Sequence, residues 1–297
     1  MRHAIETTGL TKQWADLVAV DDLSISVQTG ECYAFLGRNG SGKSTTARML
    51  LDFIRPTSGT SRVLGGSGSD PSVRARVGYL PGDLNLAGTA SADDAFRFFG
   101  GLSSPPERKQ IDDLVERFGL DPTRPVRELS TGNRRKVGLI LAFMGSPELL
   151  ILDEPTSGLD PVLQEEFREL LAERKADGAT IWLTSHVMAE VERVADRVGL
   201  IQDGHLAQEL TMADLRRQTT GRIVFTFATP PDPDAFRGLP GVTSAERGSA
   251  AGELAITTDG SVAAALAAAG ELGATAVRTE RRDLDDVFLD LFEDEGR

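Results

Sequence analysis

Four residues near position 40 have the types and the spacing of a phosphate-binding loop. Gly37, Gly42, Lys43 and Ser44 fill the pattern G-x-x-x-x-G-K-[ST], which lies between a short apolar run, residues 32–36, and the start of an expected helix. Glycines let successive backbone N–H groups curl around an anion, and the N-terminus of the following helix adds further donors. The lysine suits the β- and γ-phosphates of a nucleotide, and the serine hydroxyl suits Mg²⁺. The sequence therefore predicts nucleotide binding.

Two carboxylates follow a second apolar run. Residues 149–152 are all apolar and lead into Asp153 and Glu154. Such runs are typical of strands buried on both faces, and an open α/β sheet binds its ligands at the carboxyl ends of these strands. We expect Asp153 to hold Mg²⁺ through water, with Ser44 on the other side of the metal. Side chains alternate along a strand, so Glu154 should face elsewhere and act as the general base for an attacking water.

A third apolar run, residues 179–183, ends before Thr184, Ser185 and His186. A lone histidine is more often structural than catalytic. Its place after a buried strand favours a functional role here, either in orienting the attacking water or in bonding the γ-phosphate.

Residues 129–144 have a polar, glycine-bearing start and an apolar continuation, as expected for a helix capped by Ser130. Such a cap leaves the first N–H groups of the helix available to an anion. Trp14, in the polar segment 11–16, has two interpretations: stacking on an adenine face, or packing at the edge of a strand.

Composition and charge exclude several classes of protein. The 297 residues carry a net charge of −13, and the longest basic clusters, residues 134–136 and 278–282, are short. Because phosphate backbones are bound through Lys and Arg clusters, no nucleic-acid partner is expected. No run of 18 apolar residues occurs, and the N-terminus has no apolar signal-peptide core. Cys32, the single cysteine, is expected to be a small buried hydrophobe in a reducing compartment.

The expected elements divide the chain into two domains, residues 1–218 and 219–297. In the first, residues 3–30 predict antiparallel strands, including one at 23–27, residues 83–146 predict a helical subdomain, and Asp160 and Pro161 begin a further helix. Residues 221–280 predict the order βαββαβ of a small α+β ferredoxin-like domain, with a short first helix at 234–237. A final amphipathic helix is expected at 284–292.

Taken in order, these motifs resemble those of the ATP-binding-cassette (ABC) ATPases over residues 5–212. The matching segments are the phosphate loop GRNGSGKS (37–44), the signature LSTGN (129–133), the acidic strand LLILDE (149–154), the D-loop SGLD (157–160) and the switch histidine His186. The resemblance implies an α/β fold, a P-loop NTPase cassette with a mixed sheet core, an antiparallel β subdomain and a helical subdomain. Trp14 lies where the family keeps an aromatic residue that stacks on adenine.

The resemblance also implies the site residues. Glu154, His186 and Lys43 are expected to be catalytic, and Ser44, Asp153 and Asp83 are expected to hold Mg²⁺. The residues expected to contact ATP are Trp14, Gly37, Arg38, Asn39, Gly40, Ser41, Gly42, Lys43, Ser44, Thr45, Ser130, Gly132 and Asp160. Two cassettes of the family face head to tail, so Ser130 and Gly132 of one chain would meet the ATP bound by the other.

The sequence departs from the family at two motifs. The usual glycine and glutamine of the signature are Thr131 and Asn133 here, although Gly132 is kept. The loop after residues 76–80 should carry Gln or Glu near position 82, and it carries Gly82 and Asp83. We hypothesise that Asp83 replaces the missing metal ligand, because it is the metal-competent side chain of that loop.

The C-terminal segment RRDLDDVFLDL (281–291) is similar to the tail of cassette subunits from drug and polyketide exporters. This likeness implies export rather than import, and contact with a dimer mate or a partner. The family resemblance implies a pair of cassettes at the cytoplasmic face of the membrane, either a homodimer or this chain with a near relative, coupled to a separate transmembrane permease that binds near residues 83–120. Export of a drug-like or hydrophobic compound is then the expected function. The alternatives are a soluble ABC-type ATPase that acts without a transporter, and a regulatory module with little turnover.

Overall fold

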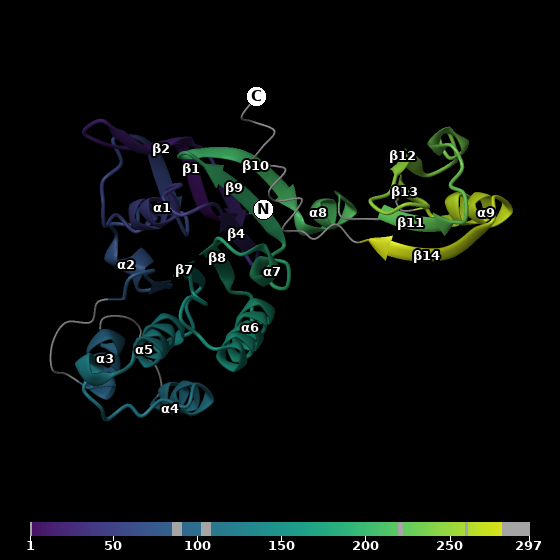
Figure 1. Cartoon of the computed structure of the whole chain (residues 1–297). Coiled ribbons are helices and arrows are strands. Elements are labelled where there is room, and N and C mark those ends of the chain that lie inside the picture. The colour runs from purple at the N-terminus through teal and green to yellow at the C-terminus, as the bar shows by residue number, and fades with distance from the viewer. Residues whose placement is uncertain (1, 85–90, 102–107, 219–221, 259–260, 281–297) are drawn as a thin grey trace. The chain divides into compact units, whose positions relative to one another are not determined.

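The computed structural model describes residues 2–84, 91–101, 108–218, 222–258 and 261–280 (Figure 1). The chain divides into two compact units, Met1–Leu210 and Thr211–Arg297. The division precedes helix α8 (Met212–Gln218), whereas the sequence places the boundary after residue 218, and that boundary stays a prediction. The expected helix at 284–292 and the exporter-like tail at 281–291 lie outside the described residues.

A six-stranded sheet organises the first unit. Its order is β10-β9-β4-β8-β7-β6, and the pairs β4–β8, β4–β9, β7–β8 and β6–β7 are parallel. The strands are β4 (Cys32–Leu36), β6 (Val77–Leu80), β7 (Leu149–Asp153), β8 (Thr180–Ser185), β9 (Arg197–Gln202) and β10 (His205–Thr211). Every residue of β4, β7 and β8 is buried, as expected for apolar runs in a parallel sheet covered on both faces. Because these three strands are parallel, the segments that follow them meet at one edge.

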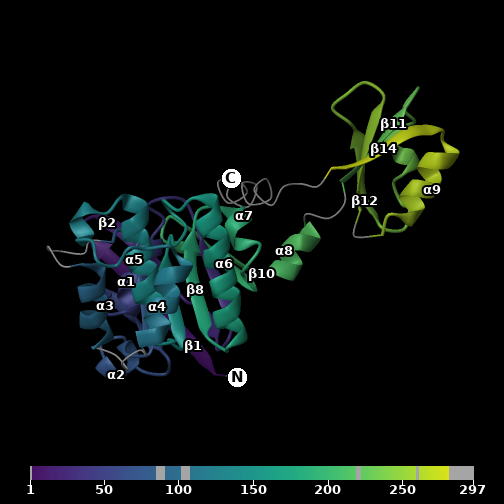
Figure 2. The ribbon, with the colours of Figure 1, turned by 90° about the horizontal axis from the view of Figure 1, so that it is seen from below.

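Helices cover both faces of this sheet. Helix α1 (Lys43–Leu50) contacts β7 and also β2 and β5 of a second, antiparallel sheet, so it lies between the two sheets. Helix α5 (Thr131–Phe143) packs against β6, and α6 (Pro161–Ala176) packs against β8. Helices α3 (Ala92–Gly100) and α4 (Arg108–Arg117) pack on α5 and form the helical group of the unit (Figure 1), seen again from below in Figure 2. The remaining short helices of this unit are α2 (Pro71–Arg74) and α7 (Met188–Val191).

The antiparallel sheet is built around β1 (His3–Trp14), which pairs with β2 (Leu17–Leu23), β3 (Ser26–Gln28) and β5 (Ser58–Val63). The prediction of one continuous strand at 23–27 is wrong, because β2 ends at Leu23 and β3 begins at Ser26. The Thr7 hydroxyl explains the break: it donates to the Leu23 carbonyl at 2.9 Å and accepts from the Ile25 N–H at 2.9 Å. Between β2 and β3, the Thr7 side chain thus provides the hydrogen-bond partner of the Leu23 carbonyl and the Ile25 N–H.

The second unit contains an antiparallel sheet of order β12-β13-β11-β14. Its strands are β11 (Arg222–Phe227), β12 (Val242–Arg247), β13 (Glu253–Thr258) and β14 (Ala274–Glu280), with helix α9 (Ala263–Glu271) between the last two. Phe225 and Phe236 are fully buried and stack with ring centroids 6.0 Å apart. The short helix expected at 234–237 is instead a 3₁₀ turn, η2 (Pro233–Ala235), which Asp232 caps by accepting from the Asp234 N–H.

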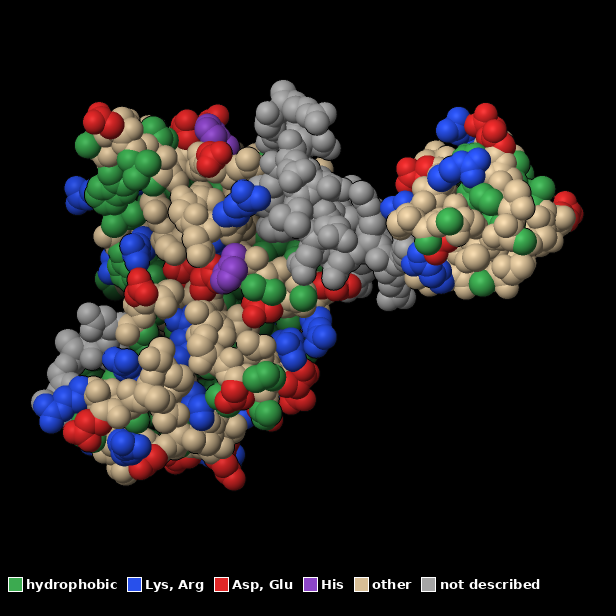
Figure 3. All heavy atoms as spheres, in the orientation of Figure 1, with side chains coloured by type: hydrophobic (Ala, Val, Ile, Leu, Met, Phe, Trp, Pro, Cys, Tyr) green, Lys and Arg blue, Asp and Glu red, His purple; other side chains and the backbone are tan. Residues whose placement is uncertain are grey.

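The surface mixes charge of both signs. On the face shown in Figure 3, basic and acidic side chains of the described residues are interspersed. None of the described helices combines the length and the hydrophobicity that crossing a bilayer requires.

Candidate active site

The loop between β4 and α1 folds as a glycine-dependent cradle. Gly40 and Gly42 have φ of 85° and 108°, in the left-handed region that side chains with a Cβ avoid. A Cβ on Gly42 would lie 2.5 Å from the Ala19 carbonyl oxygen, and one on Gly37 would lie 2.4 Å from Ser41 Oγ. The loop therefore packs too closely for side chains at these positions, and its backbone can approach an anion directly.

Lys43 lies within this cradle and is 5% exposed. Its Nζ donates to the carbonyl oxygens of Gly37 and Arg38 at 2.7 and 3.1 Å, and lies 3.4 Å from Glu154 Oε1. Ser41 Oγ and Glu154 Oε1 are buried without a hydrogen-bond partner among the described residues. Buried polar atoms are normally paired. Glu154 Oε1 has the Lys43 ammonium group as its ion-pair partner, whereas Ser41 Oγ marks a place for a further polar ligand.

Asp153 ends strand β7 and is 1% exposed. Its Oδ1 accepts from the Thr184 hydroxyl at 2.6 Å, and its Oδ2 accepts from the Gly82 N–H at 3.3 Å. Thr184 is paired in register with Asp153 on the neighbouring strand β8, and its hydroxyl oxygen also accepts from the Glu154 N–H at 2.9 Å. One threonine side chain thus fixes both acids at the end of the strand.

Glu154 is the first residue after β7, and its φ of 49° turns the chain sharply there. Its Oε2 lies 2.7 Å from His186 Nδ1, and its Oε1 is the atom near Lys43. The acids therefore face different neighbours, and the left-handed turn at Glu154, rather than alternation along a strand, separates them. The structure brings together the three residues predicted to be catalytic, Lys43, Glu154 and His186, from segments that follow three different strands.

The signature segment begins helix α5, and Ser130 caps it by accepting from the Asn133 N–H at 3.3 Å. Gly132 lies close to the D-loop, since a Cβ there would be 3.4 Å from the Gly158 carbonyl oxygen. A cavity of about 330 Å³ is lined by both segments and by Asp83, which is exposed in the loop after β6.

Sequence comparisons give the family. The family model described as "ABC transporter" matches residues 20–157. Bacitracin transport ATP-binding protein BcrA of Bacillus licheniformis is 35% identical over 76% of this chain and 75% of its own length. The chain belongs to the ABC transporter family of ATP-binding proteins. The resemblance read from the motifs is confirmed, and so is the enzymatic activity: the chain is an ABC ATPase, in which hydrolysis of ATP is coupled to transport.

Further relatives and solved structures agree. The probable multidrug ABC transporter ATP-binding protein YbhF of Escherichia coli K12 is 36% identical over 72% of this chain and 38% of its own length. Nod factor export ATP-binding protein I of Ralstonia nicotianae is 38% identical over 67% of this chain and 64% of its own length. A solved ATP-binding subunit of an ABC transporter has a TM-score of 0.67 and 27% identity, over 72% of this chain and 92% of that one. A dimeric bacterial ABC transporter cassette has a TM-score of 0.65, 21% identity and coverage of 70% and 98%, which shows the shared cassette fold.

Sequence reasoning missed Arg135, a further residue of this ABC site. It is 5% exposed, and its guanidinium group donates to five backbone carbonyl oxygens at the ends of β6 and β7. Burial lowers the pKa of Arg135, against the opposing effect of the negative charges on Asp153, Glu154 and Asp83. The signal in the sequence was helical spacing, since Arg135 lies three and four residues before Gly138 and Leu139 on the buried side of α5.

Glu190 was also missed. It comes from the short helix α7, and its Oε2 accepts from the Thr156 hydroxyl at 2.7 Å and the Ser185 hydroxyl at 3.1 Å. These bonds tie together the segments that follow β7 and β8. A single glutamate in a polar segment gives no sign of this role in the sequence.

Trp14 and Asp160 have contrasting surroundings. Trp14 is 49% exposed at the end of β1, and Lys12 Nζ lies 4.1 Å from the centroid of its ring. Asp160 is engaged by its own helix, because its Oδ1 accepts from the N–H groups of Val162 and Leu163 at 3.0 Å each. The structure therefore leaves Trp14 accessible for stacking and gives Asp160 a capping role at the start of α6.

The other residues predicted to contact ATP differ in exposure. Arg38, Asn39 and Gly40 are exposed, and Ser44 and Thr45 are half-buried in the first turn of α1.

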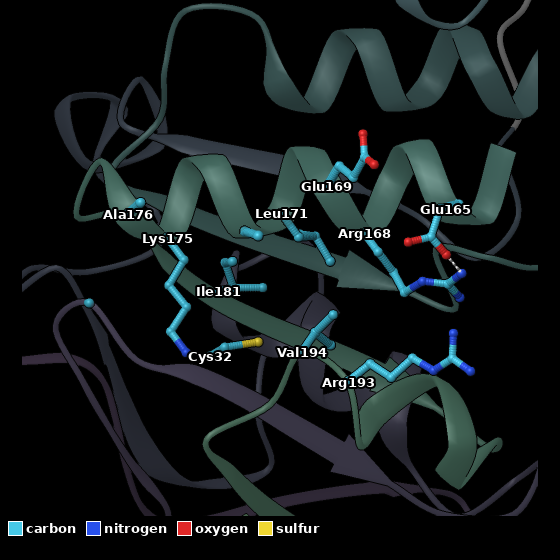
Figure 4. Close-up of a pocket in the computed structure, with 12 residues that line it drawn as sticks. Cys32, Glu165, Arg168, Glu169, Leu171, Lys175, Ala176, Ile181, Arg193 and Val194 are labelled. Carbon is cyan, nitrogen blue, oxygen red and sulfur yellow. Dashed lines mark hydrogen bonds and ion pairs between the residues drawn. The ribbon is translucent and has the colours of Figure 1, made fainter. Parts of the chain in front are cut away.

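A larger cavity, of about 600 Å³, lies at the other ends of the strands, between α6 and the first residues of β4 and β8 (Figure 4). Lys175 and Arg168 point into it from α6, above Cys32 and Ile181. Lys175 Nζ is 2.6 Å from Asp196 Oδ1, and Arg168 is bonded to Glu165. Carboxylates of the chain thus already neutralise these two cations, and the cavity takes no part in the site at the opposite ends of the strands.

Proposed function

We propose that this ABC ATPase drives an exporter of a drug-like or hydrophobic compound. The arrangement that carries the enzymatic part is the contact of Glu154 with Lys43 and His186 at the mouth of the phosphate loop. The functions of the relatives support the transport part, since their names describe bacitracin transport, a probable multidrug transporter and Nod factor export. The substrate path would lie in a separate transmembrane permease, with the cassettes attached at the cytoplasmic face of the membrane.

ATP would bind along the cradle. The N–H groups of residues 37–42 and of the start of α1 would face the phosphates. Lys43 would exchange its carbonyl partners for the β- and γ-phosphates. Trp14 would stack on adenine through the ring face that Lys12 leaves free.

Mg²⁺ fits the oxygen donors near this cradle. Ser44 and Asp153 would hold it, with Asp83 contributing from the loop after β6. Mg²⁺ commonly keeps several waters and binds substrate phosphates alongside one or two carboxylates. When bound, the ion would neutralise charge developing on the phosphoryl group.

Hydrolysis would use Glu154 as general base. The water oxygen forms a bond to the γ-phosphorus, the bond from phosphorus to the ADP oxygen breaks, and the water proton passes to the Glu154 carboxylate. His186 Nδ1, 2.7 Å from Oε2, holds one oxygen of that carboxylate. The other oxygen, Oε1, is buried and without a hydrogen-bond partner among the described residues, and it would be released to the water when Lys43 turns to the phosphates.

A second copy of the chain would complete each site. The helix N-terminus at Ser130 and Gly132 offers N–H groups that suit the γ-phosphate held by a partner. We therefore propose a head-to-tail homodimer with two ATP molecules between the cassettes.

We also propose that the C-terminal unit is a ferredoxin-like module. Its strand order β12-β13-β11-β14 and its fully antiparallel pairing support this assignment, with η2 in the place of the first helix. The domain would begin at residue 219, as the sequence predicts.

The decisive experiment compares purified wild type with Glu154→Gln and Lys43→Ala. Glu154→Gln should retain ATP binding but lose about 3 kcal/mol or more of transition-state stabilisation, which corresponds to a decrease in kcat of about 100-fold or more. The variant should also accumulate an ATP-bound dimer, which size-exclusion chromatography detects. Lys43→Ala should lose productive ATP binding. Parental turnover by Glu154→Gln would show that this residue is not the base.

The transport part has its own test. The reading frame adjacent to this gene should encode a membrane protein that co-purifies with this chain and stimulates its ATPase activity. A chain that hydrolyses ATP but finds no membrane partner in its host would favour the soluble alternative.

A further inference from the structure

Arg135 is buried at the base of the site without contacting any atom predicted to touch ATP. Its Nη1 donates to the carbonyl oxygens of Pro81 at 2.8 Å and Gly82 at 3.0 Å. Its Nη2 donates to the carbonyl oxygens of Asp153, at 2.8 Å, and Glu154, and its Nε donates to that of Pro155 at 3.2 Å. One rigid, planar donor group thus holds two loops that are far apart in the sequence.

Three of these acceptors are the carbonyls of consecutive residues, 153–155. In an extended strand successive carbonyls point in opposite directions, so they cannot all face one guanidinium group. The left-handed backbone of Glu154, with φ of 49°, makes the convergence possible. Residues with a Cβ hold such a conformation only when their surroundings enforce it, and the bonds from Arg135 supply that enforcement.

The other two acceptors bring in the loop after β6. Gly82 gives its carbonyl to Arg135 and its N–H to Asp153 Oδ2, at 3.0 and 3.3 Å. A Cβ on Gly82 would already lie 3.0 Å from that carboxylate oxygen. Arg135 therefore also sets the distance between this loop and the acid predicted to hold Mg²⁺.

We propose that Arg135 is a positioning residue for ATP hydrolysis: it fixes the turn that aims the Glu154 carboxylate at the attacking water. The inference rests on the proposed role of Glu154 as general base. Helix α5 would then have two roles: its N-terminus would contact the ATP of a partner, and Arg135 would position Glu154 in its own subunit. A lysine cannot perform this task, because an ammonium group is a point donor without the planar fork that reaches five carbonyls.

The test measures kcat, KM for ATP and equilibrium ATP binding of the full chain with Arg135→Lys and Arg135→Gln. We expect kcat to fall by about 100-fold, because a small misplacement of a catalytic group has effects of this size, while KM and ATP binding change by less than about threefold. The matched control is Arg117→Gln, which removes an arginine bonded to Glu166 and Glu173 between α4 and α6. That control should lower the thermal midpoint and leave kcat unchanged.

A double-mutant cycle separates positioning from a general loss of folded protein. If Arg135 acts through Glu154, then Arg135→Lys added to Glu154→Gln should lower kcat, per ATP-binding site, by less than about threefold. A further 100-fold loss in the double variant would overturn the inference, and so would a single Arg135→Lys variant with parental kcat. Parental kcat in Glu154→Gln would instead overturn the proposed base itself, so the two failures are distinguishable.

Discussion

Three polar groups of Glu154 are held by hydrogen bonds from other parts of the chain. Its N–H is held by Thr184, its carbonyl by Arg135, and its Oε2 by His186. Only Oε1, beside Lys43, has no hydrogen-bond partner among the described residues. A general base needs a carboxylate oxygen in a fixed place, and Oε1 would be released to the water when Lys43 turns to the phosphates.

Asp83 offers a prediction at the same scale. It is exposed in the loop that should carry the family's metal-contacting glutamine, so Asp83→Ala should raise the Mg²⁺ concentration for half-maximal ATPase activity by about tenfold, as loss of an outer metal contact does elsewhere. Titration of activity with Mg²⁺ at saturating ATP measures this shift. Asp113→Ala is the control, because Asp113 is an exposed acid paired with Lys109 on α4. An unchanged Mg²⁺ requirement in Asp83→Ala would remove Asp83 from the metal site.

At the scale of elements, the sequence predicted what local pattern determines. The apolar runs that became β4, β7 and β8, the capping residues Ser130 and Asp160, and the glycine loop all depend on neighbours in the chain. The break between β2 and β3 depends instead on the Thr7 hydroxyl, from a strand 16 residues away. The role of Arg135 depends on carbonyls from two loops that only the folded sheet brings together. Helical spacing can place Arg135 on the buried side of α5, but it does not identify the carbonyls that Arg135 contacts.

Strand β4 contains Cys32, whose thiol makes the stability of the fold depend on pH. Burial raises the pKa of the Cys32 thiol to about 12, and the nearby carboxylates of Asp196 and Glu31 act in the same direction against Lys175. The unfolded thiol titrates near 8.5. The folded state therefore binds the extra proton between these values, and the free energy of unfolding should fall as the pH rises above about 8.5, by up to about 1.4 kcal/mol per pH unit from this group.

Urea unfolding at pH 7.5 and 9.5 checks this prediction. Wild type should lose more stability between the two values than Cys32→Ala does, because other groups contribute equally to both proteins. Equal losses would show that the thiol of β4 titrates normally in the folded state.

At the scale of the whole molecule, we propose that a second cassette completes the site of each chain. The cradle, both acids and His186 lie together, whereas the capped start of α5 faces a cavity shared with the D-loop. The net charge of −13 gives the chain no attraction to anionic lipid headgroups. Attachment to a membrane is therefore expected to depend on the permease, and completion of the site on a second cassette.

Mixing two inactive variants tests the shared site. Glu154→Gln removes the base, whereas Ser130→Asp keeps a good helix cap and sets a negative charge against the partner's γ-phosphate. A mixed dimer places both defects in one site and leaves the other site intact, since each site combines the cradle of one chain with the signature of the other. Equimolar chains mixed before ATP is added should therefore recover activity, up to about a quarter of wild type if half of the dimers are mixed. Ser130→Asn, which keeps the cap without the charge, should be far more active than Ser130→Asp. Activity in the mixture equal to the mean of the two separate variants would mean that each chain completes its own site.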